Sequence, residues 1–469
     1  MPPRVFSGNR LEVLVARLAE ETAGPRDPMR SEVVVVQSAG MQRWVSMRLA
    51  ARHGVCANLS FPFPVALIYQ LLRQAIPDLP PHSPFDQGVM TWRLARLLPG
   101  MLHEPSFAAL RAYLDPAAGQ EGLKRFQLAE ILAGLFDQYM IFRPDHVRAW
   151  DRGEGDGAKA LPHEAWQAEL WRELAGDHAE LSRAALKERL LAILHQLERG
   201  QADFPGARPD LPERVSIFGI TSLPPYYLEL FDHLSRLTQV DVYLLNPCEE
   251  YWGDILSPRE AARRFKRPLR DDETRQVAPN ALLANMGGLG RDFFDGLVSL
   301  EADFESLFEP PGRASLLASI QDDIFRLTSP AAAALEGPDE PLFEPPFEPT
   351  DGTGEEAADD QPGRKVLLDP TDRSIQVHVC HGPMREVEVL RDALLGMLDE
   401  DPDLAPRDIL VMTPDVNVYA PFIRAVFDAP SASAPRLPFS IDDQSGGESP
   451  LARTLLEILD LAGGRLEAS

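Results

Sequence analysis

One short turn in this sequence has the position of a nucleotide-binding loop but not its residues. Residues 32–37 are mostly apolar and β-branched, which predicts a buried parallel strand, and the turn after them reads QSAGMQR. An ATP-binding loop needs several glycine N–H groups around the phosphates, a lysine, and a Ser or Thr for magnesium. This turn has one glycine, Gly40, and none of the five lysines of the chain lies in a Gly-Lys-Ser/Thr context. We therefore expect no ATP site and no cofactor.

Carboxylates for metal-dependent catalysis are also missing from the expected places. The later strand whose end would hold magnesium in an ATPase reads IFGITSLPP, without Asp or Glu. Two-metal nucleases need several converging carboxylates. Pairs such as Asp272-Glu273 lie instead in acidic, loop-like surroundings, where acidic residues are ordinarily solvated. We expect no catalytic residue in this chain.

Cysteine and histidine spacing predicts no metal site. The cysteines, Cys56, Cys248 and Cys380, are far apart and outside any Cys-x-x-Cys motif, and the motif HExxH does not occur. His378 and Cys380 share one face of an expected strand and His381 follows, but a fourth ligand is not evident. We expect unreactive thiols in a reducing compartment and structural roles for these histidines.

The elements that surround the turn predict an α/β fold. Ser38 to Gly40 lead into a helix with apolar residues at helical spacing. Residues 214–220 and 240–245 read as further strands, joined by a helix that begins at Pro224-Pro225 with Ser222 as its cap. This βαβ spacing implies a parallel sheet. Between residues 61 and 212 helical stripes dominate; two of them are Leu128, Ile131, Leu132, Leu135, Phe136 and Tyr139, and Trp166, Leu170, Trp171 and Leu174.

A composition break divides the chain. Residues 329–370 contain eleven acids, two bases and eight prolines, which predicts a solvated linker. A second βαβ unit follows, with strands at 375–380 and 408–412 and a helix at 384–398; a Leu-rich helix at 451–461 has no visible partner, so we expect a truncated second domain. The predicted parts are an α/β domain (1–60 plus 213–328), an all-α insertion (61–212), the linker (329–370) and the start of a second α/β domain (371–469).

The charge distribution bears on the class of partner. A net charge of −26 is unfavourable for binding nucleic acid, but residues 1–150 hold 16 Lys and Arg against 13 Asp and Glu. The basic residues are nearly all Arg, and the Ala- and Pro-rich composition favours a GC-rich genome over phosphate recognition as the reason. No stretch approaches about 18 apolar residues, and the beginning MPPRVFSGNR lacks the apolar core of a secretory signal. We expect a cytoplasmic protein without membrane contact.

Several long segments, in this order, resemble the RecC family, the gamma subunits of exodeoxyribonuclease V. They read VVVVQSAGMQRWVSMRLA, ANLSFPFPVALIY, LFDQYMIFRPD, RVSIFGITSLPPYYLELF, NPCEEYWGDI, LGRDFFD and IQVHVCHGPMREVEVLRDALLGML. The resemblance covers nearly the whole chain apart from the linker. It implies an inactive superfamily 1 helicase-like fold and the N-terminal portion of a protein about twice this length. It also implies partners, RecB, RecD and DNA, and a role in splitting the duplex, guiding the 3′-ending strand and recognising the Chi sequence.

The resemblance also implies residues that line a path for single-stranded DNA: Gln37, Ser38, Arg43, Phe63, Tyr69, Leu135, Asp137, Arg143 and Arg183. The aromatic rings offer stacking faces, and Gln37 and the arginines offer donors to bases or phosphates. Core packing remains an equal alternative for Leu135 and an open one for Phe63. The chain departs from the family at five positions, namely Ala39, Arg43, Phe63, Tyr69 and Gly134. These departures imply that strand binding is kept but the sequence read differs or is read weakly.

Two other classes of protein remain open. An active helicase or nuclease of the AddB kind would keep an ATP site and four cysteines around an iron–sulfur cluster, and a measurable ATPase activity would favour it. A pure interaction scaffold would bind RecB and RecD while the DNA contacts lie elsewhere. The balance of charge in residues 1–150 favours DNA contact over the scaffold, but by a small margin.

Overall fold

The chain consists of two units that are described separately. The computed structural model describes residues 2–23, 30–76, 78–114, 121–154, 164–200, 209–266, 278–328, 369–428 and 437–441, with Thr454, Leu455 and Ile458. Contacts between residues define a first unit, Met1–Leu367, and a second unit, Leu368–Ser469. The predicted linker lies outside the described residues apart from Asp369 and Pro370, and the predicted helix at 451–461 lies outside them apart from Thr454, Leu455 and Ile458. No helix in the described ranges is long and apolar enough to cross a membrane.

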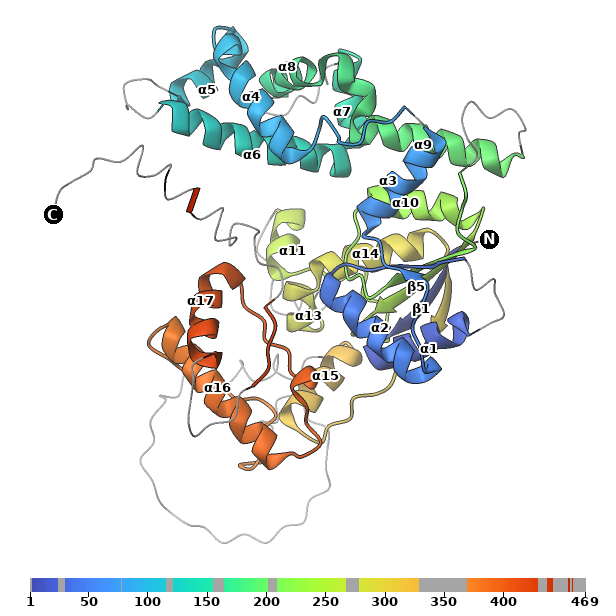
Figure 1. Ribbon diagram of the computed structural model, residues 1–469, viewed down its shortest axis with the longest axis vertical. Coiled ribbons are helices and arrows are strands. Elements are labelled where there is room, and N and C mark those ends of the chain that lie inside the picture. Colours follow the sequence, from blue (N-terminus) through green and yellow to red (C-terminus); the bar gives the residue numbers. More distant parts are fainter. Residues whose placement is uncertain are drawn as a thin grey trace, which may run out of the picture. The chain divides into compact units, whose positions relative to one another are not determined.

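The first unit is built on a parallel sheet (Figure 1). Its six strands lie in the order β3-β2-β4-β5-β1-β6. Their bounds are β1 Arg4–Gly8, β2 Glu32–Val35, β3 Leu59–Ser60, β4 Arg214–Phe218, β5 Gln239–Leu245 and β6 Asp303–Ser306. The sequence predicted β2, β4 and β5 and the parallel pairing of β4 with β5, and all of these are confirmed.

Alternating side chains place helices on both faces of the sheet. In β5, Val240 and Val242 pack into one apolar core, while Tyr243 packs into another. The Tyr243 side is covered by α1 (Leu11–Thr22) and α2 (Ala39–His53). The opposite side is covered by α3 (Pro64–Ala75), α10 (Pro225–Ser235) and α14 (Gly288–Ser299). Because a strand turns successive residues to opposite faces, these apolar strands are buried on both sides.

A helical bundle with its own core lies between β3 and β4 in the sequence. In that interval every element among the described residues is a helix, in agreement with the apolar stripes. The elements are α3, α4 Gln87–Met101, η1 Pro105–Phe107, α5 Ala108–Tyr113, α6 Glu121–Phe142, α7 Pro144–Asp151, α8 Glu164–Ala175, η3 Gly176–Leu181 and α9 Arg183–Glu198. Trp150 and Trp171 fill the bundle core. Helix α9 joins the two bodies, because Ala184 packs into the bundle while Leu190 packs against the sheet layer.

The remaining helices complete both units. In the first unit they are α11 Pro258–Phe265, α13 Ala281–Met286 and α15 Leu316–Phe325. The described part of the second unit contains α16 Pro383–Glu400, η5 Pro406–Asp408 and α17 Val416–Phe427. Helices α16 and α17 share a small core around Val387 and Phe427. The predicted helix at 384–398 is confirmed as α16.

Four expectations from the sequence are wrong. The segments 375–380 and 408–412 form no strand in the described part of the second unit, and Val379 is 95% exposed; an apolar segment becomes a strand only where a neighbour pairs with its backbone. Ser222 does not cap α10, since Pro224 occupies that position. Ile131 is exposed rather than buried, because the apolar stripe of α6 is wider than the face that meets α4.

A network of charges ties the central strands to α1. The buried guanidinium of Arg214 donates to the backbone carbonyl of Glu21 at 2.6 Å and lies 3.1 Å from the Glu32 carboxylate. The buried carboxylate of Asp241 accepts from Arg4 at 2.8 and 2.9 Å, and Arg4 also donates to the Glu21 carboxylate at 2.9 Å. We call these five residues the sheet charge network. It joins β1, β2, β4 and β5 to the end of α1.

We expect Asp241→Asn to lower the free energy of unfolding by about 3 kcal/mol, because removing one partner of a buried ion pair leaves the other charge uncompensated. Asp303→Asn is the matched control, on an exposed edge strand of the same sheet, with an expected change below about 0.5 kcal/mol. Urea denaturation followed by tryptophan fluorescence measures both. Equal effects of the two variants would mean that the network does not hold the sheet together.

Candidate nucleic-acid interface

The first group of candidate residues lies at the carboxyl edge of the sheet. β2 and β3 run parallel, and beyond their ends the Val36 N–H donates to the Pro62 carbonyl at 3.3 Å. This bond places the next residues of the two segments, Gln37 and Phe63, at the same edge. Both are exposed, and the Phe63 ring is 48% exposed. Ligands of parallel α/β sheets bind at this edge, outside the strand ends.

The turn after β2 begins α2 with a side-chain cap. The Ser38 hydroxyl accepts a hydrogen bond from the Met41 N–H at 3.1 Å, so this oxygen is used in starting the helix. Arg43, one turn further, is exposed and lines an open groove along α2 together with Gln42 and Met47. Among the described residues no carboxylate lies within ion-pair distance of Arg43. Its charge is therefore available to an anion.

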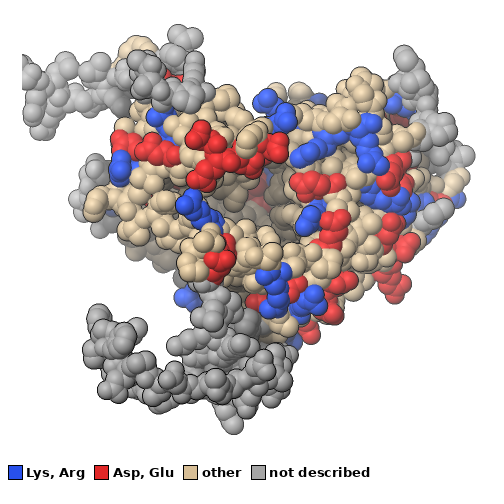
Figure 2. Space-filling model, turned by 90° about the horizontal axis from the view of Figure 1, so that it is seen from below, with Lys and Arg blue, Asp and Glu red and all other residues tan. Residues whose placement is uncertain are grey.

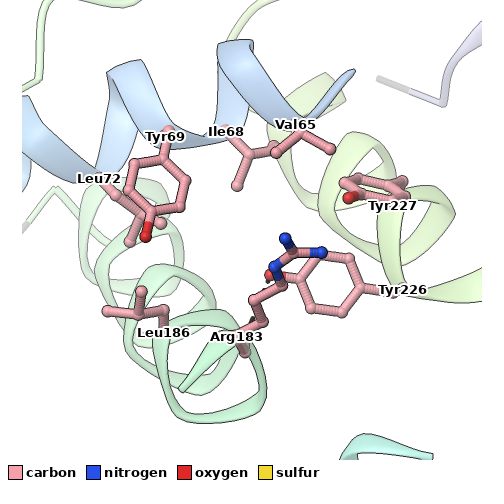
Figure 3. Close-up of a pocket in the computed structure, with 8 residues that line it drawn as sticks. All are labelled: Val65, Ile68, Tyr69, Leu72, Arg183, Leu186, Tyr226 and Tyr227. Atoms are coloured by element: carbon pink, nitrogen blue, oxygen red, sulfur yellow. Dashed lines mark hydrogen bonds between the residues drawn. The ribbon is translucent and has the colours of Figure 1, made fainter. Parts of the chain in front are cut away.

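The second group lies where the bundle meets the sheet layer. Tyr69 of α3 and Arg183, the first residue of α9, line a small cavity with Tyr226 and Tyr227 of α10 (Figure 3). The cavity admits the centre of a water molecule over about 10 Å³, which is room for about one water. The Tyr226 hydroxyl donates to the backbone carbonyl of Arg183 at 3.3 Å. The Tyr226 and Tyr227 rings are 4.8 Å apart, centre to centre. The residues around this cavity therefore hold α9 against α10.

Arg183 carries its charge beside a carboxylate. Its Nη1 lies 3.0 Å from Asp137 Oδ1 of α6, although the geometry is that of an ion pair rather than an aligned hydrogen bond. Burial raises the pKa of Asp137, the charge of Arg183 opposes this, and Asp86 adds to it. Both side chains are largely buried. The pair therefore joins α6 to α9, and little of the Arg183 charge is left for an outside phosphate.

Two further candidates lie on α6 or at its end. Leu135 is half-buried and packs against the bundle core, which favours the packing alternative left open by the sequence. Arg143 follows the last residue of α6 and is exposed, with its guanidinium 5.8 Å from the centre of the Tyr139 ring. In the described ranges it has no carboxylate partner. Arg143 thus resembles Arg43 and differs from Arg183.

The predicted site residues differ in how far their side chains are exposed to solvent. The side chains of Gln37, Phe63, Arg43 and Arg143 are exposed. Those of Tyr69, Leu135, Asp137 and Arg183 are partly buried and contact other parts of the protein. Figure 2 shows Lys and Arg side chains next to Asp and Glu over the face in view, so that a basic residue often has an acidic neighbour. The net charge of the surface is therefore a poor guide to a binding path.

Sequence reasoning missed three sets of residues that the fold brings together. Tyr226 and Tyr227 join Tyr69 and Arg183, and their signal was the Tyr-Tyr pair directly after Pro224-Pro225. Trp92 of α4 is exposed and contacts Phe126 of α6, with ring centres 4.9 Å apart. A His–Glu–His cluster between α9 and α10 had no sequence motif, because its second histidine comes from a different helix than the other two residues.

Comparison with known proteins identifies the class to which this parallel-sheet unit and its helical bundle belong. Residues 4–327 match the family model described as the RecC N-terminal domain. The chain belongs to this family.

Three curated relatives agree with this assignment. The chain is 37% identical over 98% of its length to the RecBCD enzyme subunit RecC of Escherichia coli K12, covering 41% of that protein. It is 32% identical to the subunit of the same name in Haemophilus influenzae, over 99% of this chain and 43% of the relative. It is also 32% identical to that of Mycolicibacterium smegmatis, over 100% and 40%. The chain thus spans about two fifths of the length of these relatives.

A double-mutant cycle tests the role of the Asp137–Arg183 pair. We expect Asp137→Asn and Arg183→Gln to show a coupling of about 1 to 2 kcal/mol in urea denaturation, because largely buried charges are weakly screened. The control is the pair Arg10–Glu309, 3.3 Å apart with both side chains half exposed, for which we expect less than about 0.5 kcal/mol. A coupling no larger than the control would mean that solvent screens Asp137 from Arg183.

Proposed function

We propose that this chain is a non-catalytic, DNA-binding part of a RecBCD-type helicase and nuclease complex. In this proposal it has an inactive superfamily 1 helicase-like fold, with the bundle as an insertion. It helps to split the duplex, guides the 3′-ending strand and takes part in recognition of Chi during repair of double-strand breaks. Its partners are RecB and RecD, and it acts in the cytoplasm. Membership of the RecC N-terminal family supports the proposal as a whole.

The observation that carries the DNA-binding part is the pair Gln37 and Phe63 at the carboxyl edge of the sheet. The exposed Phe63 ring contributes little to the stability of the fold. Together with the Gln37 amide, it could instead bind an unpaired base. The ring offers a stacking face, and the amide offers a donor and an acceptor to a base edge. Arg43, on the helix that follows Gln37, can contact a phosphate.

The absence of catalysis in the proposal follows from the residues at the same edge. Three residues separate the end of β2 from the start of α2, and the Ser38 hydroxyl caps that helix. The segment after β4 carries no carboxylate before α10. A triphosphate with magnesium would need a lysine and an acid at these places. The AddB-like alternative from the sequence would require an ATP site elsewhere.

We expect Phe63→Ala to weaken binding of a fluorescent single-stranded oligonucleotide by about 5- to 150-fold, because stacking on an aromatic ring contributes about 1 to 3 kcal/mol per base. Arg43→Ala should weaken binding and reduce the slope of log K against log salt by about 0.7, since one phosphate contact is lost. Fluorescence anisotropy across a salt series measures both.

Arg52→Ala is the matched control, because Arg52 lies in the last turn of the same helix and is paired with Glu20 at 3.1 Å. It should leave affinity and salt slope unchanged. Loss of binding in all three variants, or in none, would remove the sheet edge from the DNA path. Repeating the titration with an octamer library tests whether the sequence preference differs from the usual Chi, as the departures at Ala39 and Arg43 imply.

A second candidate function, attachment to another subunit, is favoured by the outer face of the bundle. Trp92 is 69% exposed and contacts Phe126, and Val89, Leu123 and Ile131 of the same two helices are exposed as well. Exposed apolar side chains gathered in this way are typical of a contact with another protein. This function is compatible with DNA binding at the sheet edge.

We expect Trp92→Ala to reduce co-purification of the chain with RecB and RecD while leaving single-strand binding intact, because large aromatic side chains often dominate interface energies. Tyr113→Ala, an exposed aromatic on α5 of the same bundle, is the control. Equal recovery of the complex with both variants would exclude this face as the contact.

A further inference from the structure

Two histidines and a glutamate meet where α9 packs against α10. His195 and Glu198 are three residues apart on α9, and His233 lies on α10. His233 Nδ1 is 3.4 Å from one oxygen of Glu198, and His195 Nδ1 is 3.6 Å from the other. The centres of the two imidazole rings are 4.4 Å apart, and the ring planes meet at 72°. The potential ligand atoms of all three side chains lie within 4.8 Å of one another.

This spacing is close to that of a transition-metal site. Zinc binds imidazole nitrogen and carboxylate oxygen at about 2.0 to 2.2 Å, so neighbouring ligand atoms of a tetrahedral site are about 3.3 Å apart. His233 Nδ1 and His195 Nδ1 lie 3.4 and 3.6 Å from the two different oxygens of Glu198, slightly more than this spacing. The side chains would therefore have to rotate to bring both nitrogens and one carboxylate oxygen around an ion. Two histidines and one carboxylate, with water as the fourth ligand, are a known zinc ligand set.

The surroundings of the cluster leave room for a cation. Glu198 and His233 are largely buried, whereas His195 is half exposed, so an ion could enter from solvent beside His195. The nearest fixed cation is Arg236, with Nη1 3.8 Å from Glu198. Arg236 also donates to Asp232 at 2.8 Å, which takes up part of its charge. Glu198 is therefore incompletely neutralised by protein groups.

We propose that His195, Glu198 and His233 form a binding site for a divalent transition metal, zinc in the first place, which fastens α9 to α10. The histidines are scattered in the sequence, and for that reason the sequence predicted no metal. The ion would bind between a helix that enters the bundle core and a helix of the sheet layer. The site contains no residue assigned to DNA contact, so the proposal is independent of the proposed function.

The effect of a bound ion on the fold depends on the position of α9. Its first turns pack into the bundle and beside the Asp137–Arg183 pair, and its later turns pack on the sheet layer. The cluster lies in its last turn, at the other end from Arg183. A bound ion would stabilise the folded state in proportion to its affinity, because the unfolded chain has no such site. It would hold the bundle in a fixed orientation on the sheet.

The experiment measures zinc binding to the full chain, free of any histidine tag, by equilibrium dialysis and metal analysis. We expect one zinc per chain in the wild type and an affinity more than about 10-fold lower in His195→Gln and His233→Gln, since loss of a direct ligand exceeds the effect of losing an outer partner. His103→Gln, an exposed histidine of the bundle, is the control and should bind as the wild type does.

Thermal unfolding gives the second measurement. Zinc should raise Tm of the wild type and of His103→Gln but not of His195→Gln, which is the variant least expected to disturb the fold because that side chain is half exposed. Far-UV circular dichroism of each metal-free variant verifies folding. The absence of stoichiometric zinc in the wild type, or equal binding by His195→Gln and His103→Gln, would overturn the proposal.

Discussion

The buried charges at the centre of the sheet are the constraint on which the rest of the structure depends. Arg214 and Asp241 lie on adjacent strands, and each needs a partner from the first 32 residues of the chain. An unpaired charge there would be far more costly than any surface contact. The segments before residue 33 and after residue 213 must therefore meet in one sheet. Between β3 and β4 the chain covers one face of the sheet with α3, leaves the sheet to form the helical bundle, and returns to it along α9.

Helix α9 connects the bundle with the sheet layer. Several candidate residues lie at this junction. Ala184 belongs to the bundle core and Leu190 to the core above the sheet, so this helix is shared by both bodies. Asp137, Arg183 and Tyr69 lie at the junction because α6, α9 and α3 converge there. Contacts of this kind set the orientation of the bundle. They separate candidate residues that are engaged in packing from candidate residues whose side chains are exposed.

The candidate arginines differ in whether a carboxylate of the protein already neutralises their charge. An arginine beside a carboxylate in a partly buried pair gives up affinity for an outside phosphate, as with Arg183. Arg43 and Arg143 are exposed and, in the described parts of the chain, have no acidic partner. The exposed Phe63 ring adds a stacking surface that is insensitive to salt. A binding site formed in this way is compatible with a net charge of −26.

The sequence by itself determined β2, β4, β5, their parallel arrangement and the helical stripes of α6 and α8, because these depend on local periodicity. That the turn after β2 has one glycine and no lysine is a matter of residue type and can be read from the sequence alone. It could not predict β1 and β6, since Arg4–Gly8 is short and the exposed β6 has no apolar pattern. It wrongly predicted strands at 375–380 and 408–412, because pairing depends on neighbours and not on the segment itself. Only the tertiary structure decided that Asp137 pairs with Arg183 and that His195 meets His233, since these contacts join helices whose packing no local pattern encodes.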